Sequence, residues 1–218
     1  AAVGAVPWGP SHDGPVIQTT VFVKRWPLRC LWCSNPESQD MFPNLMVREI
    51  NCGGCGACVE ACPEGAITLT KEEGRKIDRE RCTQCFQCVD ACIYHSLNVC
   101  GWYVDVDEVL DEVIKDEAFY KNSGGGVTVS GGEALSQADF VASLLEACGV
   151  KGLHTVLDTT GYAAWETMKT VLPHVNLVLF DIKHLDPGEH KRTTGVEDGL
   201  MLTNLTKTSA IKCISTLL

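Results

Sequence analysis

Eight cysteines between residues 52 and 92 have the types and spacing that iron–sulfur chemistry needs. They form two copies of the pattern C-x-x-C-x-x-C-x-x-x-C, namely Cys52, Cys55, Cys58 and Cys62, then Cys82, Cys85, Cys88 and Cys92. In proteins with two 4Fe-4S clusters, the first three cysteines of each copy bind one cluster and the fourth binds the other. The spacing therefore predicts one cluster on Cys52, Cys55, Cys58 and Cys92, and a second on Cys82, Cys85, Cys88 and Cys62.

The same cysteines have two other interpretations, a zinc site or a set of disulfides. The chain holds thirteen cysteines, an odd number, and its first residues show no basic region followed by an apolar run. Regular spacing without an export signal favours cluster ligation in a reducing compartment. The sequence therefore predicts a cytoplasmic iron–sulfur protein.

The net charge and the hydrophobic content of the chain indicate which classes of binding partner to exclude. The chain has 218 residues, 45% of them hydrophobic, and a formal net charge of -10. An acidic surface repels phosphate backbones and anionic lipids, so we expect neither nucleic acid nor a membrane as partner. No run approaches the roughly 20 apolar residues that cross a bilayer.

The elements that must position these groups alternate between strands and helices. Apolar runs predict strands over residues 16–24, 127–129, 155–157, 177–182 and 211–218. Helical spacing predicts helices that start after Asp105 and over residues 136–148, 163–172 and 202–209. This alternation predicts an α/β fold with parallel strands, whose polar groups meet at the carboxyl ends of the strands.

Several short motifs follow those strands and carry a family resemblance. They are Asp13-Gly14-Pro15, residues 20–24, residues 27–38 with Cys30 and Cys33, Ser130-Gly131-Gly132-Glu133, residues 158–162, Asp181-Ile182-Lys183 and residues 191–196. Together they resemble the glycyl-radical-enzyme activating enzymes, which are radical S-adenosylmethionine proteins. The resemblance implies a partial parallel (β/α) barrel over 1–40 and 101–218, incomplete at its C-terminal end. It also implies an inserted ferredoxin-like α+β module over residues 41–100.

The resemblance also implies a chemistry and its partners. A third 4Fe-4S cluster, held by Cys30, Cys33 and one more cysteine, binds S-adenosylmethionine, and one electron from it releases a deoxyadenosyl radical. That radical takes a hydrogen from a glycine of a partner glycyl-radical enzyme. A flavodoxin- or ferredoxin-type protein is the implied electron donor. The sequence does not choose among choline, glycerol, hydroxyphenylacetate, toluene-type and pyruvate lyases as the activated enzyme.

The motifs after the strands are the implied cofactor site. Gly131 and Gly132 let backbone approach the methionine part, and Glu133 accepts from its ammonium group. Asp181 accepts from the ribose and Lys183 pairs with the carboxylate. Asp158 and Thr159 provide oxygens that, with Asp181, hold a monovalent cation; the remaining residue of this predicted set is Ser130.

One residue breaks the resemblance. The family's three-cysteine motif begins where this chain has Trp26, and tryptophan has only an N–H donor to offer. Val16, Gln18 and Arg25 also depart from the family pattern. Cys100 is the candidate for a replacement ligand, while Cys148 has the place of a core residue.

The missing cysteine leaves two functional interpretations open. The first is an activating enzyme impaired by Trp26, and the alternative is a non-catalytic ferredoxin-like electron-transfer or partner-binding protein. Iron content separates them, because two cubane clusters hold about eight irons and three hold about twelve.

Overall fold

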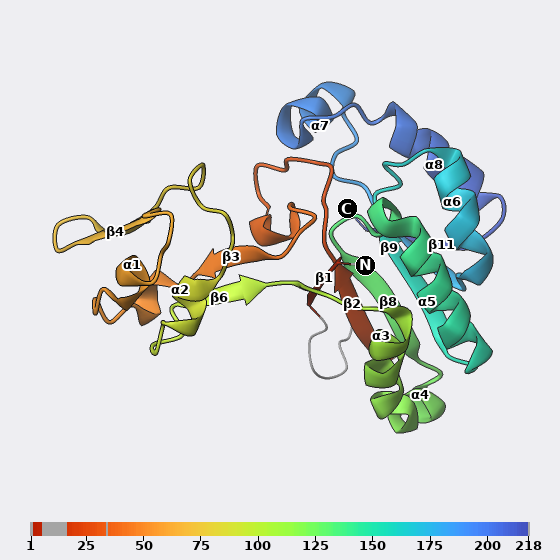
Figure 1. Ribbon diagram of the computed structural model, residues 1–218. Helices are drawn as coiled ribbons and strands as arrows, with labels where there is room; N and C mark the ends of the chain where they lie inside the picture. The colour runs from red at the N-terminus through yellow and green to blue at the C-terminus, as the bar shows by residue number, and fades with distance from the viewer. Residues whose placement is uncertain (1, 6–16, 34, 218) are drawn as a thin grey trace. The chain divides into compact units, whose positions relative to one another are not determined.

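The structure is a computed structural model that describes residues 2–5, 17–33 and 35–217. The chain forms two compact units (Figure 1): the larger unit comprises residues 1–42 and 102–218, and the smaller unit residues 43–101. The predicted boundaries, after residues 40 and 100, fall one or two residues earlier. Asp13-Gly14-Pro15 and Val16 of the predicted pattern, and Ser34 within the motif over residues 27–38, lie outside the described residues.

A seven-stranded sheet organises the larger unit, in the order β11-β10-β9-β8-β2-β1-β7. Five strands are parallel: β2 (Gln18–Val23), β8 (Gly126–Gly131), β9 (His154–Thr159), β10 (Leu177–Asp181) and β11 (Cys213–Leu217). Two strands extend it in antiparallel orientation: β1 (Ala2–Ala5) and β7 (Trp102–Tyr103). The predicted α/β fold with parallel strands is confirmed, whereas β1 and β7 were not predicted.

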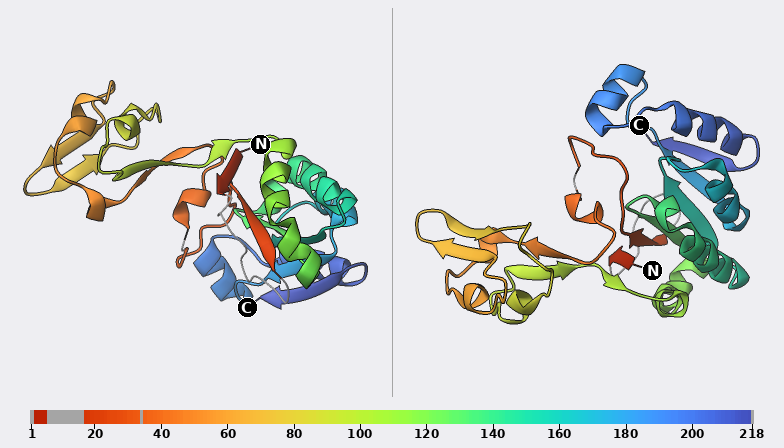
Figure 2. Two further views of the ribbon diagram at one scale, coloured as in Figure 1. Left: turned by 90° about the horizontal axis from the view of Figure 1, so that it is seen from below. Right: turned by 45° about the horizontal axis from the view of Figure 1, so that its top comes forward.

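Helices connect the parallel strands, and most of them match the predicted ranges. They are α3 (Val106–Val113), α4 (Glu117–Ser123), α5 (Ala138–Val150), α6 (Trp165–Val171), α7 (Pro187–Thr194) and α8 (Gly199–Ser209). Helix α3 begins as predicted, because Asp105 and Glu108 form a capping box. Helices α4 and α7 were not predicted. Figure 2 shows α5 and α6 lying together on one face of the sheet, where residues such as Leu144 and Met168 join the buried core.

Short 3₁₀ helices complete the connections. They are Pro36–Ser38, Glu49–Asn51, Ile114–Asp116, Ala134–Gln137 and Leu172–His174. The segment Ala134–Gln137 corrects the predicted helix 136–148: the chain turns first in a 3₁₀ helix, and the α-helix begins only at Ala138. Among the described residues, no helix has the length and apolarity to span a membrane.

The smaller unit is built from two copies of one motif. Strand β3 (Asn44–Val47) pairs with β6 (Leu97–Cys100), and β4 (Ile67–Thr70) pairs with β5 (Gly74–Ile77), both antiparallel. Two short helices, α1 (Ala57–Glu60) and α2 (Gln87–Asp90), follow the cysteine turns. The two helices start 30 residues apart, as do the two cysteine runs.

Each short helix follows a residue with left-handed backbone geometry. Gly56 has φ of 81° and Phe86 has φ of 62°. Glycine adopts that conformation without steric cost, whereas Phe86 adopts it with some strain. The turn shape is therefore common to both copies although the residue is not.

Candidate functional site

The predicted site residues of the larger unit meet around one cavity. The cavity has a volume of about 140 Å³ and lies at the carboxyl ends of β8, β9 and β10. Its lining includes every residue predicted for the cofactor site except Glu133: Cys30, Cys33, Ser130, Gly131, Gly132, Asp158, Thr159, Asp181 and Lys183. Trp26 and Trp32 line the same cavity.

The loop that carries Cys30 is held by helix α7. The backbone N–H of Arg29 donates to the carbonyl of Thr194 at 2.7 Å, and that of Leu31 donates to the carbonyl of Thr193 at 2.9 Å. These two bonds flank Cys30, whose side chain is buried. A further bond from the Cys33 N–H to the Cys30 carbonyl, 3.1 Å, closes the turn between the two cysteines.

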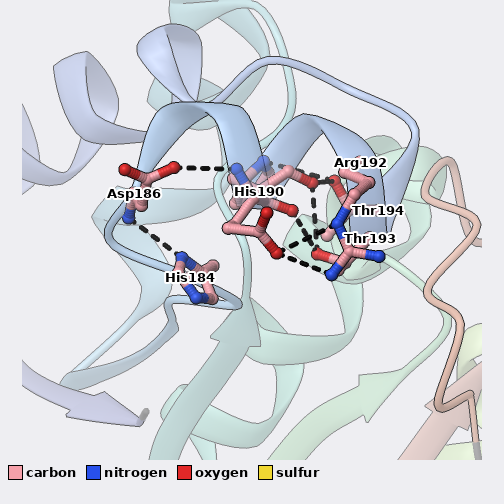
Figure 3. Close-up of polar contacts among 7 residues, drawn as sticks. His184, Asp186, His190, Arg192, Thr193 and Thr194 are labelled. Carbon is pink, nitrogen blue, oxygen red and sulfur yellow. Dashed lines mark hydrogen bonds and ion pairs between the residues drawn. The ribbon is translucent and has the colours of Figure 1, made fainter.

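Polar contacts within α7 keep its end in place (Figure 3). The Asp186 carboxylate caps the helix by accepting from the Glu189 N–H at 2.8 Å. His190, which is buried, donates from Nδ1 to the carbonyl of Val196 at 2.9 Å, beyond the helix end. No role is predicted for His190 from the sequence, because it lies just before the motif over residues 191–196 and α7 itself is not predicted.

Trp26 occupies a wall of the cavity beside Lys183. The Lys183 Nζ lies 5.4 Å from the centre of the Trp26 ring, and Lys183 also forms an ion pair with Asp181. Burial raises the pKa of the Cys30 thiol, while the charge of Lys183 and the neighbouring Trp26 side chain oppose that rise.

Glu133 lies beneath the cavity and is fully engaged by its own chain. Its Oε1 accepts from Leu135 N–H at 3.1 Å and from the Thr159 hydroxyl, and its Oε2 accepts from Thr160 N–H at 3.0 Å and Thr160 Oγ1 at 2.7 Å. Burial raises the pKa of this carboxyl. A carboxylate has about four acceptor positions. The predicted bond to a ligand ammonium group is therefore not what this geometry provides, and Glu133 instead joins the ends of β8 and β9.

The two glycines before Glu133 are needed for close approach to β2 and the loop after it. Gly131 has φ of 101°, and a Cβ there would lie 2.6 Å from the Cα of Phe22. A Cβ on Gly132 would lie 2.6 Å from the Arg25 carbonyl oxygen. Both glycines thus bring the two chain segments together and also leave backbone exposed to the cavity.

Asp158, on the cavity wall, has a carboxyl whose pKa is strongly raised. Burial raises its pKa to about 6, and the nearby charge of Asp181 adds to that rise. The Ser130 hydroxyl donates to Asp158 Oδ2 at 2.6 Å and opposes it. Asp158 therefore holds a negative charge at neutral pH but can take up a proton in mild acid.

The cysteines of the smaller unit line two separate cavities. One cavity is lined by Cys52, Cys55, Cys58 and Cys92, and the other by Cys62, Cys82, Cys85 and Cys88. This grouping has the crossed arrangement that the spacing predicts. Four thiols around each cavity suit the ligand number of a 4Fe-4S cluster.

The larger unit offers a different number of thiols. Within the described residues, Cys30 and Cys33 are the only cysteines that line its cavity, and Trp26 stands on the wall beside them. Two thiols and an indole do not fit a cluster that takes three cysteine ligands. The smaller unit therefore fits its clusters, whereas the cavity of the larger unit does not fit a third.

Comparison with known proteins identifies relatives for nearly the whole chain. Residues 51–96 match the family model described as "4Fe-4S dicluster domain". The isethionate sulfite-lyase activating enzyme of Nitratidesulfovibrio vulgaris is 44% identical over 198 residues, which cover 89% of this chain and 64% of the relative. The chain is a relative of the glycyl-radical-enzyme activating enzymes.

A second activating enzyme and a solved structure match as well. The (2S)-3-sulfopropanediol dehydratase activating enzyme of Klebsiella oxytoca is 42% identical over 205 residues, 92% of this chain and 65% of the relative. A crystal structure of a domain of pyruvate-formate lyase-activating enzyme from Bacteroides vulgatus is 34% identical, with a TM-score of 0.39, over 43% of this chain and 60% of that one. The chain spans slightly less than two thirds of the length of its two curated activating-enzyme relatives.

These relatives support the predicted family and cofactors. The domain match confirms iron–sulfur binding by the cysteine-rich segment. The similarity to activating enzymes supports the S-adenosylmethionine site that the family resemblance implies, which stays a proposal. The comparisons favour the activating-enzyme interpretation over the electron-carrier alternative, and the monovalent cation stays a prediction.

Proposed function

We propose that this chain is part of an activating enzyme that binds S-adenosylmethionine and acts on a glycyl-radical enzyme. The observation that carries the proposal is the single cavity onto which Cys30, Cys33, the Gly131-Gly132 turn and Lys183 all converge. These groups come from separate parts of the chain and share one edge of a parallel sheet. The sheet then corresponds to part of a (β/α) barrel, and the smaller unit to a ferredoxin-like insert with two 4Fe-4S clusters.

The cavity residues have complementary roles toward S-adenosylmethionine. Lys183 pairs with the ligand carboxylate, because Asp181 and the Trp26 ring already hold its ammonium group at the cavity wall. Asp158 and Asp181 accept from the ligand's hydroxyl or ammonium donors. With Thr159, the same two carboxylates form the proposed monovalent cation site. The backbone of Gly131 and Gly132, which lines the cavity, lies against the methionine part.

The partners follow from the same proposal. The two relatives are named for different lyases and dehydratases, so the match supports a glycyl-radical enzyme as partner without fixing its substrate. A flavodoxin- or ferredoxin-type protein supplies electrons to the clusters of the smaller unit, which carry them one at a time. A cytoplasmic location suits both the clusters and such a donor.

Trp26 limits the reaction that this chain supports. Reductive cleavage of the sulfonium bond needs an electron delivered beside the ligand, and the cavity has two thiols where three are needed to hold iron. We expect the purified chain to bind S-adenosylmethionine and to hold about eight irons. We expect little 5′-deoxyadenosine to form from it.

The test compares the chain with its Trp26→Cys variant after anaerobic reconstitution. Binding is measured by calorimetry with S-adenosylmethionine, and iron and 5′-deoxyadenosine are quantified under reduction with dithionite. We expect about eight irons per chain in the parent and about twelve in the variant. The variant should also cleave S-adenosylmethionine. Absence of S-adenosylmethionine binding in both proteins would refute the proposal, and so would a variant that gains the irons without any cleavage.

A further inference from the structure

The two halves of the smaller unit differ in charge at equivalent positions. A shift of 30 residues superposes the two cysteine runs and relates β3 to β5 and β4 to β6. Under this shift Arg75 on β5 corresponds to Leu45 on β3, and Ser96 corresponds to Ala66. Arg75 lines the cavity of Cys52, Cys55, Cys58 and Cys92, whereas Leu45 lines the other cavity. One cluster site therefore has a cation where its twin has an apolar side chain.

Arg75 is held firmly and out of solvent. Its side chain is 1% exposed. Its Nη2 lies 2.5 Å from the Ser96 hydroxyl and 3.2 Å from Glu49 Oε2, and its Nε donates to Glu49 Oε1 at 3.2 Å. Its side chain lines the same cavity as Cys52 and Cys58. A guanidinium keeps its charge throughout the physiological range.

Glu49 offsets only part of that charge at the cluster site. Its side chain is 55% exposed, so water screens it, whereas the Arg75 side chain is 1% exposed and is bonded to Ser96. Glu49 is also absent from the lining of the cavity, where Arg75 and Cys58 both lie. The cysteines of this site therefore face a net positive environment.

No described basic side chain lines the second cavity. Two arginines bond to backbone of its lining residues: Arg79 and Arg81 are exposed and donate to the carbonyls of Leu45 and Glu64 at 3.0 Å and 2.5 Å. The lining includes Glu64, itself exposed, together with Phe86 and Leu45. The cysteines of this site therefore face an apolar and weakly acidic environment.

We propose that Arg75 makes the two clusters unequal, so that the cluster on Cys52, Cys55, Cys58 and Cys92 has the higher reduction potential. Reduction adds one negative charge to a cubane, and a buried cation beside it favours the reduced form. A reduced cluster at the second site thus passes one electron to the oxidised cluster at the Arg75 site. The donor cluster returns to its oxidised state, the acceptor becomes reduced, and no proton is required.

Unequal potentials would give electron transfer within the smaller unit a direction. An electron that enters from an external one-electron donor comes to rest on the Arg75 cluster. This conclusion depends on the two-cluster content of the unit and not on the activating reaction of the proposed function. Its test therefore stands even if S-adenosylmethionine does not bind.

The test measures potentials in the full chain, reconstituted anaerobically and titrated with titanium(III) citrate while electron paramagnetic resonance follows each cluster. We expect two one-electron steps in the unaltered chain. Arg75→Gln should lower the midpoint potential of the upper step by about 59 mV, which is a tenfold change in its equilibrium constant. The potential of the lower step should stay unchanged. Arg81→Gln is the matched control, since its guanidinium is exposed, and should move neither step.

A second variant covers the case in which Arg75→Gln loses a cluster, which iron analysis would reveal. Glu49→Gln removes the partly exposed counter-charge and should raise the same upper step. Coincident steps in the unaltered chain would overturn the inference. So would a downward shift of the lower step in Arg75→Gln, or a Glu49→Gln variant in which the upper step does not rise.

Discussion

The change Glu133→Gln tests whether this carboxylate holds the protein together or holds the ligand. Glu133 is 1% exposed and accepts four hydrogen bonds from its own chain. Glutamine has the same shape, but it replaces one oxygen by an NH₂ group. In either orientation of the amide, a backbone N–H then faces that NH₂ group: Leu135 N–H in one, Thr160 N–H in the other. The two threonine hydroxyls can rotate to accept, but a backbone N–H cannot.

The magnitude follows from that count. One buried N–H left without an acceptor costs about 1 to 3 kcal/mol, and the loss of charge weakens the remaining bonds. Burial of the ionised carboxyl, which raises its pKa, is relieved in the variant and offsets part of the loss. We therefore expect Glu133→Gln to lower the free energy of unfolding by about 2 kcal/mol. For a chain of this size that is roughly 4 to 8 °C in Tm.

Thermal unfolding under anaerobic conditions, followed by far-ultraviolet circular dichroism, measures the effect. The matched control is Glu166→Gln on α6, because the Glu166 side chain is 79% exposed and its variant should unfold like the parent. Calorimetry with S-adenosylmethionine is run on each protein below its Tm. If Glu133→Gln unfolds at the parent temperature but binds the ligand much more weakly, the carboxylate contacts the ligand and the structural interpretation is refuted.

Three further predictions concern the larger unit. Folding raises the pKa of Asp158 from 3.8 to about 6, so the folded state loses stability as the pH rises through that range. Asp158→Asn should therefore be more stable than the parent by about 3 kcal/mol at pH 7.5. Chemical unfolding at several pH values should show this gain shrinking toward pH 4. His190→Ala should speed amide exchange at Arg29 and Leu31, whose N–H groups bond to the end of α7, by at least about tenfold, read by mass spectrometry. Cys148→Ser should leave the iron content unchanged and cost about 1 to 3 kcal/mol, because the side chain is fully buried and a serine hydroxyl there loses its hydrogen bonds to water.

The sequence predicted those parts of the fold that local patterns determine. Residues 177–180 are all apolar because the middle of β10 is buried, and Asp105 marks the start of α3 through its capping box. Helix α7 lacks such a pattern, since Pro187–Thr194 is mostly polar and is fixed by its contacts with the cysteine loop. Strand β7 has two residues, too few for any periodicity to identify.

The same limit applies to the candidate site. Residue type and spacing were sufficient to predict how the eight cysteines group into two sets of four, because each set follows a short local sequence pattern. They were insufficient for Glu133 and Arg75, whose partners come from distant segments. Glu133 reads as a ligand contact until Thr159 and Thr160 are seen to surround it. Arg75 reads as an ordinary strand residue until the pairing of β4 and β5 places it in a cluster cavity.

With tryptophan at position 26, binding of S-adenosylmethionine and binding of iron become separate properties of the cavity, which a third cysteine would combine. The Trp26 ring lies 5.4 Å from the Lys183 Nζ, and both residues line the same cavity as Cys30. Under the proposed function, we expect binding of the ligand carboxylate to depend on Lys183 and to be kept with tryptophan at position 26, whereas iron binding depends on the number of thiols and is lost. The smaller unit keeps all eight of its cysteines and its buried Arg75. Trp26→Cys should therefore restore iron to the larger unit while the potentials of the two clusters in the smaller unit stay where they were.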